Sequence, residues 1–125
     1  IFDPTLFLCI ENKMDWAVRF VKRANQIGVE ICAGTDYIND LNRPFPFIFD
    51  ELDLYVEKCG FYPMEAIFTV TKVAAEALGV CDKVGTVEVG KQADLLILSG
   101  NPFDDIKELR KIKVVIKRGI EINVD

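Results

Sequence analysis

The feature that most constrains the fold is a succession of apolar and amphipathic segments that ends at Asp36. Residues 5–10 are apolar and partly β-branched, which predicts a buried strand. Apolar side chains then recur at helical spacing between Asn12, the expected N-cap of a helix, and Gly28, its expected end. Residues 29–33 predict a short second strand. A strand, a helix and a strand in this order predict a βαβ unit whose two strands are parallel.

After a polar loop over residues 37–46, the pattern predicts helices first and short strands afterwards. Apolar side chains over residues 49–59 predict one helix, and Pro63 fits the first position of another, with Glu65 where the helix dipole favours negative charge. The expected buried stripe of this second helix consists of Ile67, Val70, Val73, Ala74, Ala77 and Leu78. Short strands are expected at residues 86–89, 93–98, 112–117 and 120–124, with a short polar helix over 104–111 and a hairpin turn at Arg118-Gly119. The predicted fold class is therefore α/β.

Composition excludes several classes of function. The chain has 125 residues, which fits one domain or one domain with an appendage. Its net charge is −5, from 15 Lys and Arg against 20 Asp and Glu, which argues against a nucleic-acid or anionic-membrane surface. The sequence contains no histidine, so a His-based zinc site or a Ser-His-Asp triad cannot be built from its residues alone. A basic cluster over residues 107–118 is diluted by Asp104, Asp105 and Glu108, which is typical of a solvated face.

The cysteines and the apolar runs bear on the cellular compartment. Cys9, Cys32, Cys59 and Cys81 are widely spaced and include no CxxC pair, which favours reduced thiols in a cytoplasmic protein over a disulfide framework. The first residues show neither a basic region nor a small-residue cleavage pattern, so we expect no signal peptide. No apolar run approaches the roughly 20 residues that span a bilayer, so we expect no membrane partner.

Asp36 is the first candidate for chemistry. It follows Gly34-Thr35 at the carboxyl end of an apolar strand and opens a polar loop. In parallel α/β folds, ligands bind at that end of the strands because the loops converge there. A carboxylate at this position could bind a metal, act as a general base, or do both in turn. An Asp after a Gly is also a common turn residue or helix cap, so the local sequence leaves both readings open.

Two further motifs resemble phosphate chemistry only superficially. The run Asp82-Lys83-Val84-Gly85-Thr86 differs at one position from the DKTGT signature of P-type ATPases, but no supporting strand precedes it. Gly85, Gly90 and Lys91 have the spacing of a phosphate-binding loop, yet Gln92 stands where Ser or Thr would bind magnesium, and a strand follows instead of a helix. The first match is a coincidence, and the second run is better explained as turns that join short strands.

Several motifs occur in a fixed order along almost the whole chain. They are Ala33-Gly34-Thr35-Asp36, Cys59-Gly60-Phe61-Tyr62-Pro63-Met64-Glu65-Ala66, Thr69–Gly79, Gly85–Leu95, Asn101–Ile106 and Val115–Gly119. In this order and spacing they resemble the C-terminal part of the amidohydrolase superfamily, and in particular its imidazolonepropionase-like and prolidase-like branch. Pro4-Thr5-Leu6 also fits a strand of that branch.

The resemblance implies a fold and a site. The family fold is a (β/α)8 barrel with a small β-sandwich domain made from both chain ends. Residues 1–83 would then be the last βα units of the barrel, and residues 84–125 the C-terminal strands of the sandwich. Asp36 would be a metal ligand and proton shuttle for a water activated by zinc or a similar divalent ion. Tyr37, Asn39 and Asp40 would lie on the loop that faces a small-molecule substrate.

The sequence also departs from the family pattern. The family's HxH pair, bridging Lys and two further His come from earlier strands, and the chain has no positions for them. Because one carboxylate cannot hold a catalytic ion, we expect no bound metal and no turnover from this chain alone. Its open strand surfaces would be covered by the missing N-terminal barrel portion or by a second copy in a homo-oligomer. The alternative is a self-contained, non-catalytic α/β module for oligomerisation or binding.

Overall fold

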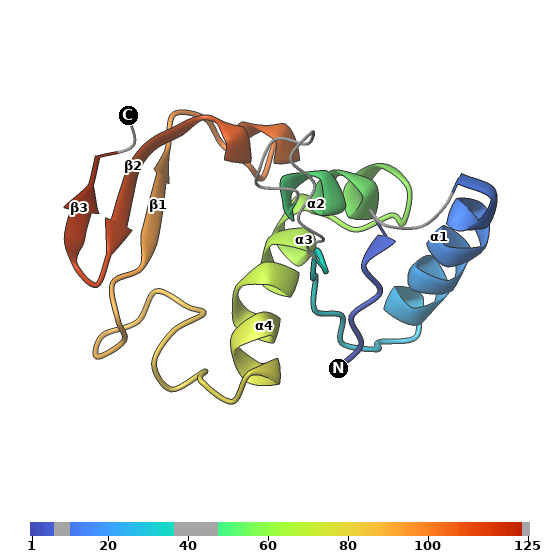
Figure 1. The fold of residues 1–125 in the computed structure, drawn as a ribbon, viewed down its shortest axis with the longest axis horizontal. Coiled ribbons are helices and arrows are strands. Elements are labelled where there is room, and N and C mark those ends of the chain that lie inside the picture. The colour runs from blue at the N-terminus through green and yellow to red at the C-terminus, as the bar shows by residue number, and fades with distance from the viewer. Residues whose placement is uncertain (7–10, 37–47, 124–125) are drawn as a thin grey trace.

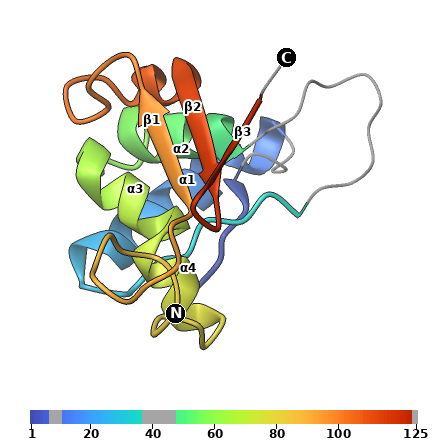
Figure 2. The ribbon, with the colours of Figure 1, turned by 90° about the vertical axis from the view of Figure 1, so that its left-hand side faces the viewer.

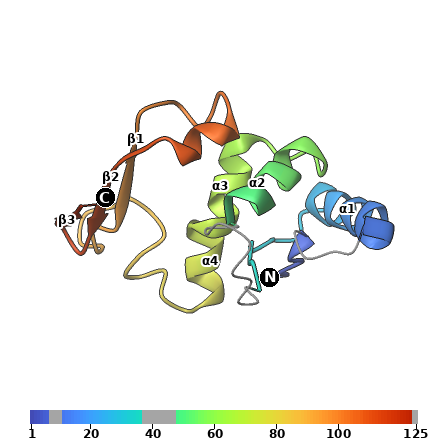
Figure 3. The ribbon, with the colours of Figure 1, turned by 45° about the horizontal axis from the view of Figure 1, so that its top comes forward.

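The computed structural model describes residues 1–6, 11–36 and 48–123, and this part of the chain is mixed α/β. Its helices are α1 (Glu11–Gln26), α2 (Ile48–Glu57), α3 (Pro63–Val70), α4 (Lys72–Ala77) and the 3-10 helix η2 (Ile106–Arg110), and its strands are β1 (Leu95–Leu98), β2 (Ile112–Lys117) and β3 (Ile120–Ile122). The sheet and α1 lie at opposite ends of the molecule, with α2, α3 and α4 between them (Figures 1 and 3). Within the described ranges, no helix is long and apolar enough to cross a membrane.

A parallel pairing joins the N-terminal segment to the segment that follows α1. Phe2 pairs with Ile31: the Phe2 amide donates to the Glu30 carbonyl, and the Cys32 amide to the Phe2 carbonyl, both at 2.9 Å. The parallel direction agrees with the prediction, but the single bridge between the described residues involves Phe2, which precedes the predicted first strand. The prediction of a strand from residue 5 is wrong for Thr5, because the Asp3 carboxylate accepts a hydrogen bond from the Thr5 amide and turns the chain there. Residues 7–10 lie outside the described ranges.

Helix α1 buries one face and leaves another open. It begins at Glu11, so the prediction that Asn12 caps it is wrong, but Gly28 follows its end with a φ of 77°, as predicted. Its buried face consists of Ala17, Val21 and Ala24. On the open face, Trp16 is 70% exposed and stacks on Phe20 with 5.6 Å between ring centroids. The larger apolar side chains of this amphipathic helix therefore lie outside the core.

The core lies where α1, α2 and the N-terminal segment meet. Its largest fully buried apolar side chains are Leu6, Val21, Leu52, Tyr55 and Cys59. The Tyr55 ring stacks on Phe61, which follows α2, with 5.0 Å between centroids. Apolar side chains of η2 complete the cluster, so the segment between β1 and β2 is packed onto the helices.

Helices α3 and α4 replace the single helix predicted from Pro63. Pro63 begins α3 and Glu65 lies in its first turn, as predicted, and the Glu65 carboxylate also accepts a hydrogen bond from the Tyr62 amide at 2.8 Å. The helix breaks at Thr71, whose hydroxyl donates back to the Ile67 carbonyl at 2.8 Å. The predicted stripe is not the buried one: its members are half-buried or exposed, and the buried side chains are Ala66, Thr69 and Ala75.

The three strands form an antiparallel sheet in the order β1-β2-β3 (Figure 2). Strand β2 has the predicted bounds. Arg118 and Gly119 both have positive φ, 52° and 79°, so the predicted hairpin turn is of type I′. The prediction of a strand over residues 86–89 is wrong. Gly85 and Gly90 both adopt positive φ, 98° and 93°, and the chain between them forms turns.

Ion pairs hold the C-terminal half together. The Asp94 carboxylate accepts hydrogen bonds from the Arg118 amide at 2.8 Å and the Lys117 amine at 2.5 Å, across the hairpin. These bonds lower the pKa of Asp94 from 3.8 to about 2. The Arg110 guanidinium of η2 pairs with Asp50 and Asp53 of α2, at 2.8 and 2.9 Å. The basic cluster is therefore a solvated, ion-paired face, as predicted.

Two glycines provide a matched test of packing against α4. A Cβ on Gly85 would lie 2.6 Å from the Ala75 Cβ and 3.0 Å from the Thr71 carbonyl oxygen, whereas a Cβ on Gly90 would meet nothing within 4 Å. Gly90→Ala should therefore lower the unfolding free energy by about 1 kcal/mol, because alanine is strained at a positive φ but meets no neighbour. Gly85→Ala should cost more than ~2 kcal/mol, because the chain must also move away from α4. Urea unfolding measures both, and equal costs would contradict the close contact.

The Asp94 bonds predict an acid-dependent loss of stability. Since the folded pKa of about 2 lies below the ordinary 3.8, the ionised carboxylate stabilises the fold fully above that range, and the contribution is lost as the pH falls through about 2. Asp94→Asn should unfold at lower urea than the native chain at pH 7, and the gap should narrow in acid. Paired urea titrations check this, and a gap of constant size would show that the Asp94 charge contributes nothing.

Candidate functional site

The candidate site is the edge where the two parallel segments end. Because the segments at Phe2 and Ile31 run in the same direction, the residues that follow them, Asp3 and Gly34, meet at this edge. The Ala33 amide also donates to the Thr69 carbonyl at 3.2 Å, which ties the end of the second segment to α3. The edge is therefore fixed from both sides.

Asp3 and Gly34 are packed against each other. A Cβ on Gly34 would lie 2.1 Å from Asp3 Oδ2, so only glycine leaves room for the carboxylate in this position. The same carboxylate accepts hydrogen bonds from the Thr5 amide at 3.3 Å and from the Thr5 hydroxyl at 3.1 Å. Burial and the nearby Asp3 charge raise the pKa of the Cys32 thiol, so this thiol is kept protonated.

Two residues at this edge hold unusual backbone conformations. Thr5 has a φ of 42° and Asp36 a φ of 40°, in the left-handed region that side chains rarely adopt. Strained residues of this kind collect at functional sites, where the surrounding structure enforces them. Asp36 is exposed, so its carboxylate is accessible from solvent. Tyr37, Asn39 and Asp40, the predicted substrate loop, lie outside the described residues.

A buried carboxylate lies next to this edge. Glu51 of α2 is fully buried, and its Oε1 accepts a hydrogen bond from the Leu6 amide at 2.7 Å. Burial first, and then the Glu51 charge, raise the pKa of the Tyr55 phenol. The same two causes raise the pKa of the Cys59 thiol to about 12. Tyr55 and Cys59 are therefore uncharged parts of the core.

Comparison with known proteins identifies the family. The model of the amidohydrolase family matches residues 11–122. The chain belongs to the amidohydrolase family. An imidazolonepropionase from Thermoplasma acidophilum is 35% identical over 95 residues, and an ochratoxinase from Aspergillus niger is 34% identical over 93 residues. Each match covers 74% of this chain, but only 23% and 18% of the respective relative.

Solved structures share the fold of this amidohydrolase chain. A putative prolidase from Bifidobacterium longum superimposes with a TM-score of 0.78 at 39% identity, over 85% of this chain and 26% of the other. A Xaa-Pro dipeptidase crystallised with methionine in its active site gives a TM-score of 0.76 at 34% identity, over 86% and 26%. The chain thus spans about a quarter or less of the proteins that it matches.

The amidohydrolase chain does not supply a complete metal centre within its described part. Residues 1–6, 11–36 and 48–123 contain no group of three His, Cys, Asp or Glu side chains that could hold an ion. Catalytic zinc sites use roughly three protein ligands. The exposed carboxylate of Asp36 is therefore not joined by two further ligands in the described part of the chain, and the described residues do not fit a metal by themselves.

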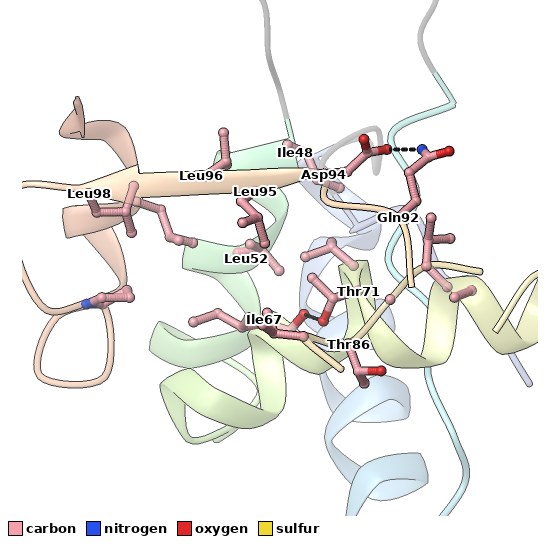
Figure 4. A pocket seen from close by; sticks show the side chains of 18 of the residues that line it. Ile48, Leu52, Ile67, Thr71, Thr86, Gln92, Asp94, Leu95, Leu96 and Leu98 are labelled. Carbon is pink, nitrogen blue, oxygen red and sulfur yellow. Dashed lines mark hydrogen bonds between the residues drawn. The ribbon is translucent and has the colours of Figure 1, made fainter. Parts of the chain in front are cut away.

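An apolar groove of about 810 Å³ separates the helices from the sheet. Figure 4 shows Leu95 of β1 pointing toward Leu52 of α2, while Leu96 points the opposite way. Ile67 and Val70, two members of the predicted stripe of α3, also line the groove. Its polar residues are engaged: Asp94 in the hairpin and Thr71 with the Ile67 carbonyl. The groove therefore suits an apolar occupant.

The turn between Gly85 and Lys91 has no geometry for a phosphate. The Lys91 amine donates to the Thr86 hydroxyl and to Glu88, and the Thr86 hydroxyl donates to Glu88 as well. These bonds occupy the groups that a phosphate-binding loop would direct at its ligand, and β1 follows the turn instead of a helix. The run is a turn before β1 and not a phosphate-binding loop, as predicted, although the strand predicted within it at residues 86–89 is not formed.

Sequence reasoning missed Asp3 and Glu51. Asp3 carried no signal beyond its place after two apolar residues. Glu51 did carry one, because it falls at helical spacing with Leu52, Tyr55 and Cys59, on the apolar face of α2. A carboxylate on the buried face of a helix needs hydrogen-bond donors, and the Leu6 amide is one of them.

The contact between Asp3 and Gly34 predicts strong coupling between the two positions. Gly34→Ala should displace the Asp3 carboxylate, break its bonds to Thr5 and lower the unfolding free energy by about 1 kcal/mol. In a chain that already carries Asp3→Ala, the same substitution should cost almost nothing, because the clash is gone. A double-mutant cycle by urea unfolding measures this coupling. Additive effects would show that the two residues do not constrain each other.

Proposed function

We propose that this chain is the C-terminal part of a metal-dependent hydrolase of C–N bonds, in an amide, a cyclic amide or a dipeptide. The observation that carries the proposal is the exposed Asp36 at the shared carboxyl edge of two parallel segments, in a chain of the amidohydrolase family. Ligands of parallel α/β folds bind at that edge. The names of the relatives, an imidazolonepropionase, an ochratoxinase and a Xaa-Pro dipeptidase, favour a small C–N substrate.

In this proposal Asp36 is a metal ligand and proton acceptor in the complete enzyme. A bound zinc or similar ion supplies an activated water. Tyr37, Asn39 and Asp40 follow directly and would line the substrate side. The chain alone is inactive in this proposal, because its sequence has no histidine and its described residues include no group of three side chains that could hold a metal ion.

The partner in this proposal is the remainder of the longer polypeptide. Residues 1–83 would complete its barrel, and residues 84–125 its sandwich domain. Support comes from the open apolar surfaces: Trp16 on α1, the groove beside β1, and Val87 and Val89, which are 86% and 106% exposed. A homo-oligomer of this chain is the second possibility. We also propose a cytoplasmic location, which the free thiols of Cys32, Cys59 and Cys81 support.

A non-catalytic binding module is the alternative function. The observation in its favour is that the described residues lack a metal-ligand cluster. A module of this kind would need neither Asp36 nor a metal, so substitution at Asp36 separates the two proposals.

The test places this chain in a complete enzyme. A chimera of the Thermoplasma acidophilum imidazolonepropionase, with its matching region replaced by this chain, should bind a divalent metal and hydrolyse imidazolonepropionate or a Xaa-Pro dipeptide. Asp36→Asn in the chimera should lower kcat by about 100-fold or more, since a proton acceptor contributes that much. The isolated chain should bind no stoichiometric metal by mass spectrometry.

Asp82→Asn is the matched control for this experiment. Asp82 is also exposed and lies in a turn, but far from the edge in sequence, so its substitution should leave kcat unchanged. A chimera that turns over equally well with Asn at position 36 would refute the catalytic role of Asp36. Stoichiometric zinc on the isolated chain would refute the statement that its own residues are insufficient.

A further inference from the structure

Glu51 is a buried carboxylate, and the free energy that its burial costs requires an explanation. It is 0% exposed, in the first turn of α2, and belongs to a helix face that otherwise buries apolar side chains. Removing a carboxylate from water is unfavourable unless hydrogen bonds replace the lost hydration. The bond from the Leu6 amide, at 2.7 Å, joins two residues that are 45 positions apart. Glu51 therefore fixes the end of the N-terminal segment to α2.

The residue before Leu6 is the strained Thr5. Its φ of 42° is exceptional for a β-branched side chain, so neighbouring contacts must hold it there. The Leu6 amide is bound to Glu51 on one side of Thr5, and the Thr5 amide and hydroxyl are bound to Asp3 on the other. The turn is thus anchored at both ends, and the Glu51 anchor comes from another element, α2.

Asp3 passes this constraint to the second segment. Its carboxylate fills the space that a Cβ on Gly34 would occupy. Gly34 lies two residues before Asp36, whose φ of 40° is the second strained conformation at this edge. A continuous series of contacts therefore runs from Glu51 through the turn at Thr5 and through Asp3 to the chain that presents Asp36.

We propose that Glu51 is a positioning residue. Its carboxylate accepts a hydrogen bond from the Leu6 amide and thereby holds Asp3 against Gly34. This contact in turn fixes the backbone that presents Asp36. The proposal rests on the proposed function for the importance of Asp36, but its geometry does not depend on a metal or a substrate. It explains why the buried carboxylate of Glu51 lies beside the strained turn at Thr5. Each is unfavourable alone, and together they define one conformation of the edge.

The test compares two substitutions at Glu51 by NMR of the full chain. Glu51→Gln retains an acceptor oxygen, and Glu51→Leu has similar volume without one. In Glu51→Leu, the Leu6 amide should exchange at least about tenfold faster with solvent, because its acceptor is lost. The backbone shifts and couplings of Thr5, Gly34 and Asp36 should change at the same time. Glu51→Gln should restore both the protection and the shifts.

Glu57→Leu is the matched control. Glu57 lies on the same helix but is exposed, where it pairs with Lys107 at 2.7 Å. Its substitution should leave the Leu6 amide and the resonances of Asp36 unchanged. Equal changes at Asp36 in both leucine variants would overturn the proposal, because the effect would then be a general property of α2. Glu51→Gln behaving as Glu51→Leu would also overturn it.

Asp3→Ala tests the middle of the series, and it keeps the proposal falsifiable if Glu51→Leu does not fold. Asp3 is exposed, so its loss should be tolerated. The resonances of Gly34 and Asp36 should shift, while protection of the Leu6 amide stays within about twofold of the native value, since Glu51 remains. Unchanged resonances of Asp36 in this variant would overturn the proposal.

These outcomes are distinguishable from a failure of the proposed function. The NMR measurements need no metal, substrate or catalytic turnover. If the resonances of Asp36 respond to Glu51→Leu but Asp36→Asn leaves hydrolysis by the chimera unchanged, the hydrolase role alone is refuted. If Asp36 is essential in the chimera but its resonances do not change in Glu51→Leu, the positioning role alone is refuted.

Discussion

The parallel pairing of Phe2 with Ile31 is the constraint on which the rest of the structure depends. Because both segments run in one direction, their ends meet at one edge, and the residues after them must share that space. Gly34 has no side chain, which allows the Asp3 carboxylate to occupy the shared space. An antiparallel pairing would have separated these two residues, and Asp36 would have no partner segment beside it.

The packing around this pairing divides the chain into a tight half and an open half. Near the edge, α1 and α2 bury Val21, Leu52 and Tyr55 completely. On the other side, β1 faces α3 and α4 across an apolar groove of about 810 Å³, and the ion pairs of Arg110 with α2 hold η2 in place. The apolar side chains that line this groove are unfavourable in water when nothing covers them. The open groove is consistent with a chain that spans about a quarter or less of its relatives.

Prediction from the sequence succeeded where the signal is local. The hairpin at Arg118-Gly119 and the first turn of α3 at Pro63 depend on residues within a few positions of each other. It failed at residues 86–89, where alternating apolar residues resemble a strand, but positive φ at Gly85 and Gly90 produces turns. It also failed for the buried stripe that was predicted over α3 and α4. Periodicity identifies an apolar face of a helix but does not show which residues cover that face.

The sequence by itself determined the C-terminal hairpin, the first turn of α3, the absence of histidine, the resemblance to amidohydrolases and the candidate Asp36. These depend on residue types and on short spacings. Only the tertiary structure decided that Asp3 lies against Gly34 and that Glu51 accepts a hydrogen bond from the Leu6 amide. These contacts join residues far apart in the chain. Their energies depend on burial and on the direction of each segment, which exist only once the chain has folded.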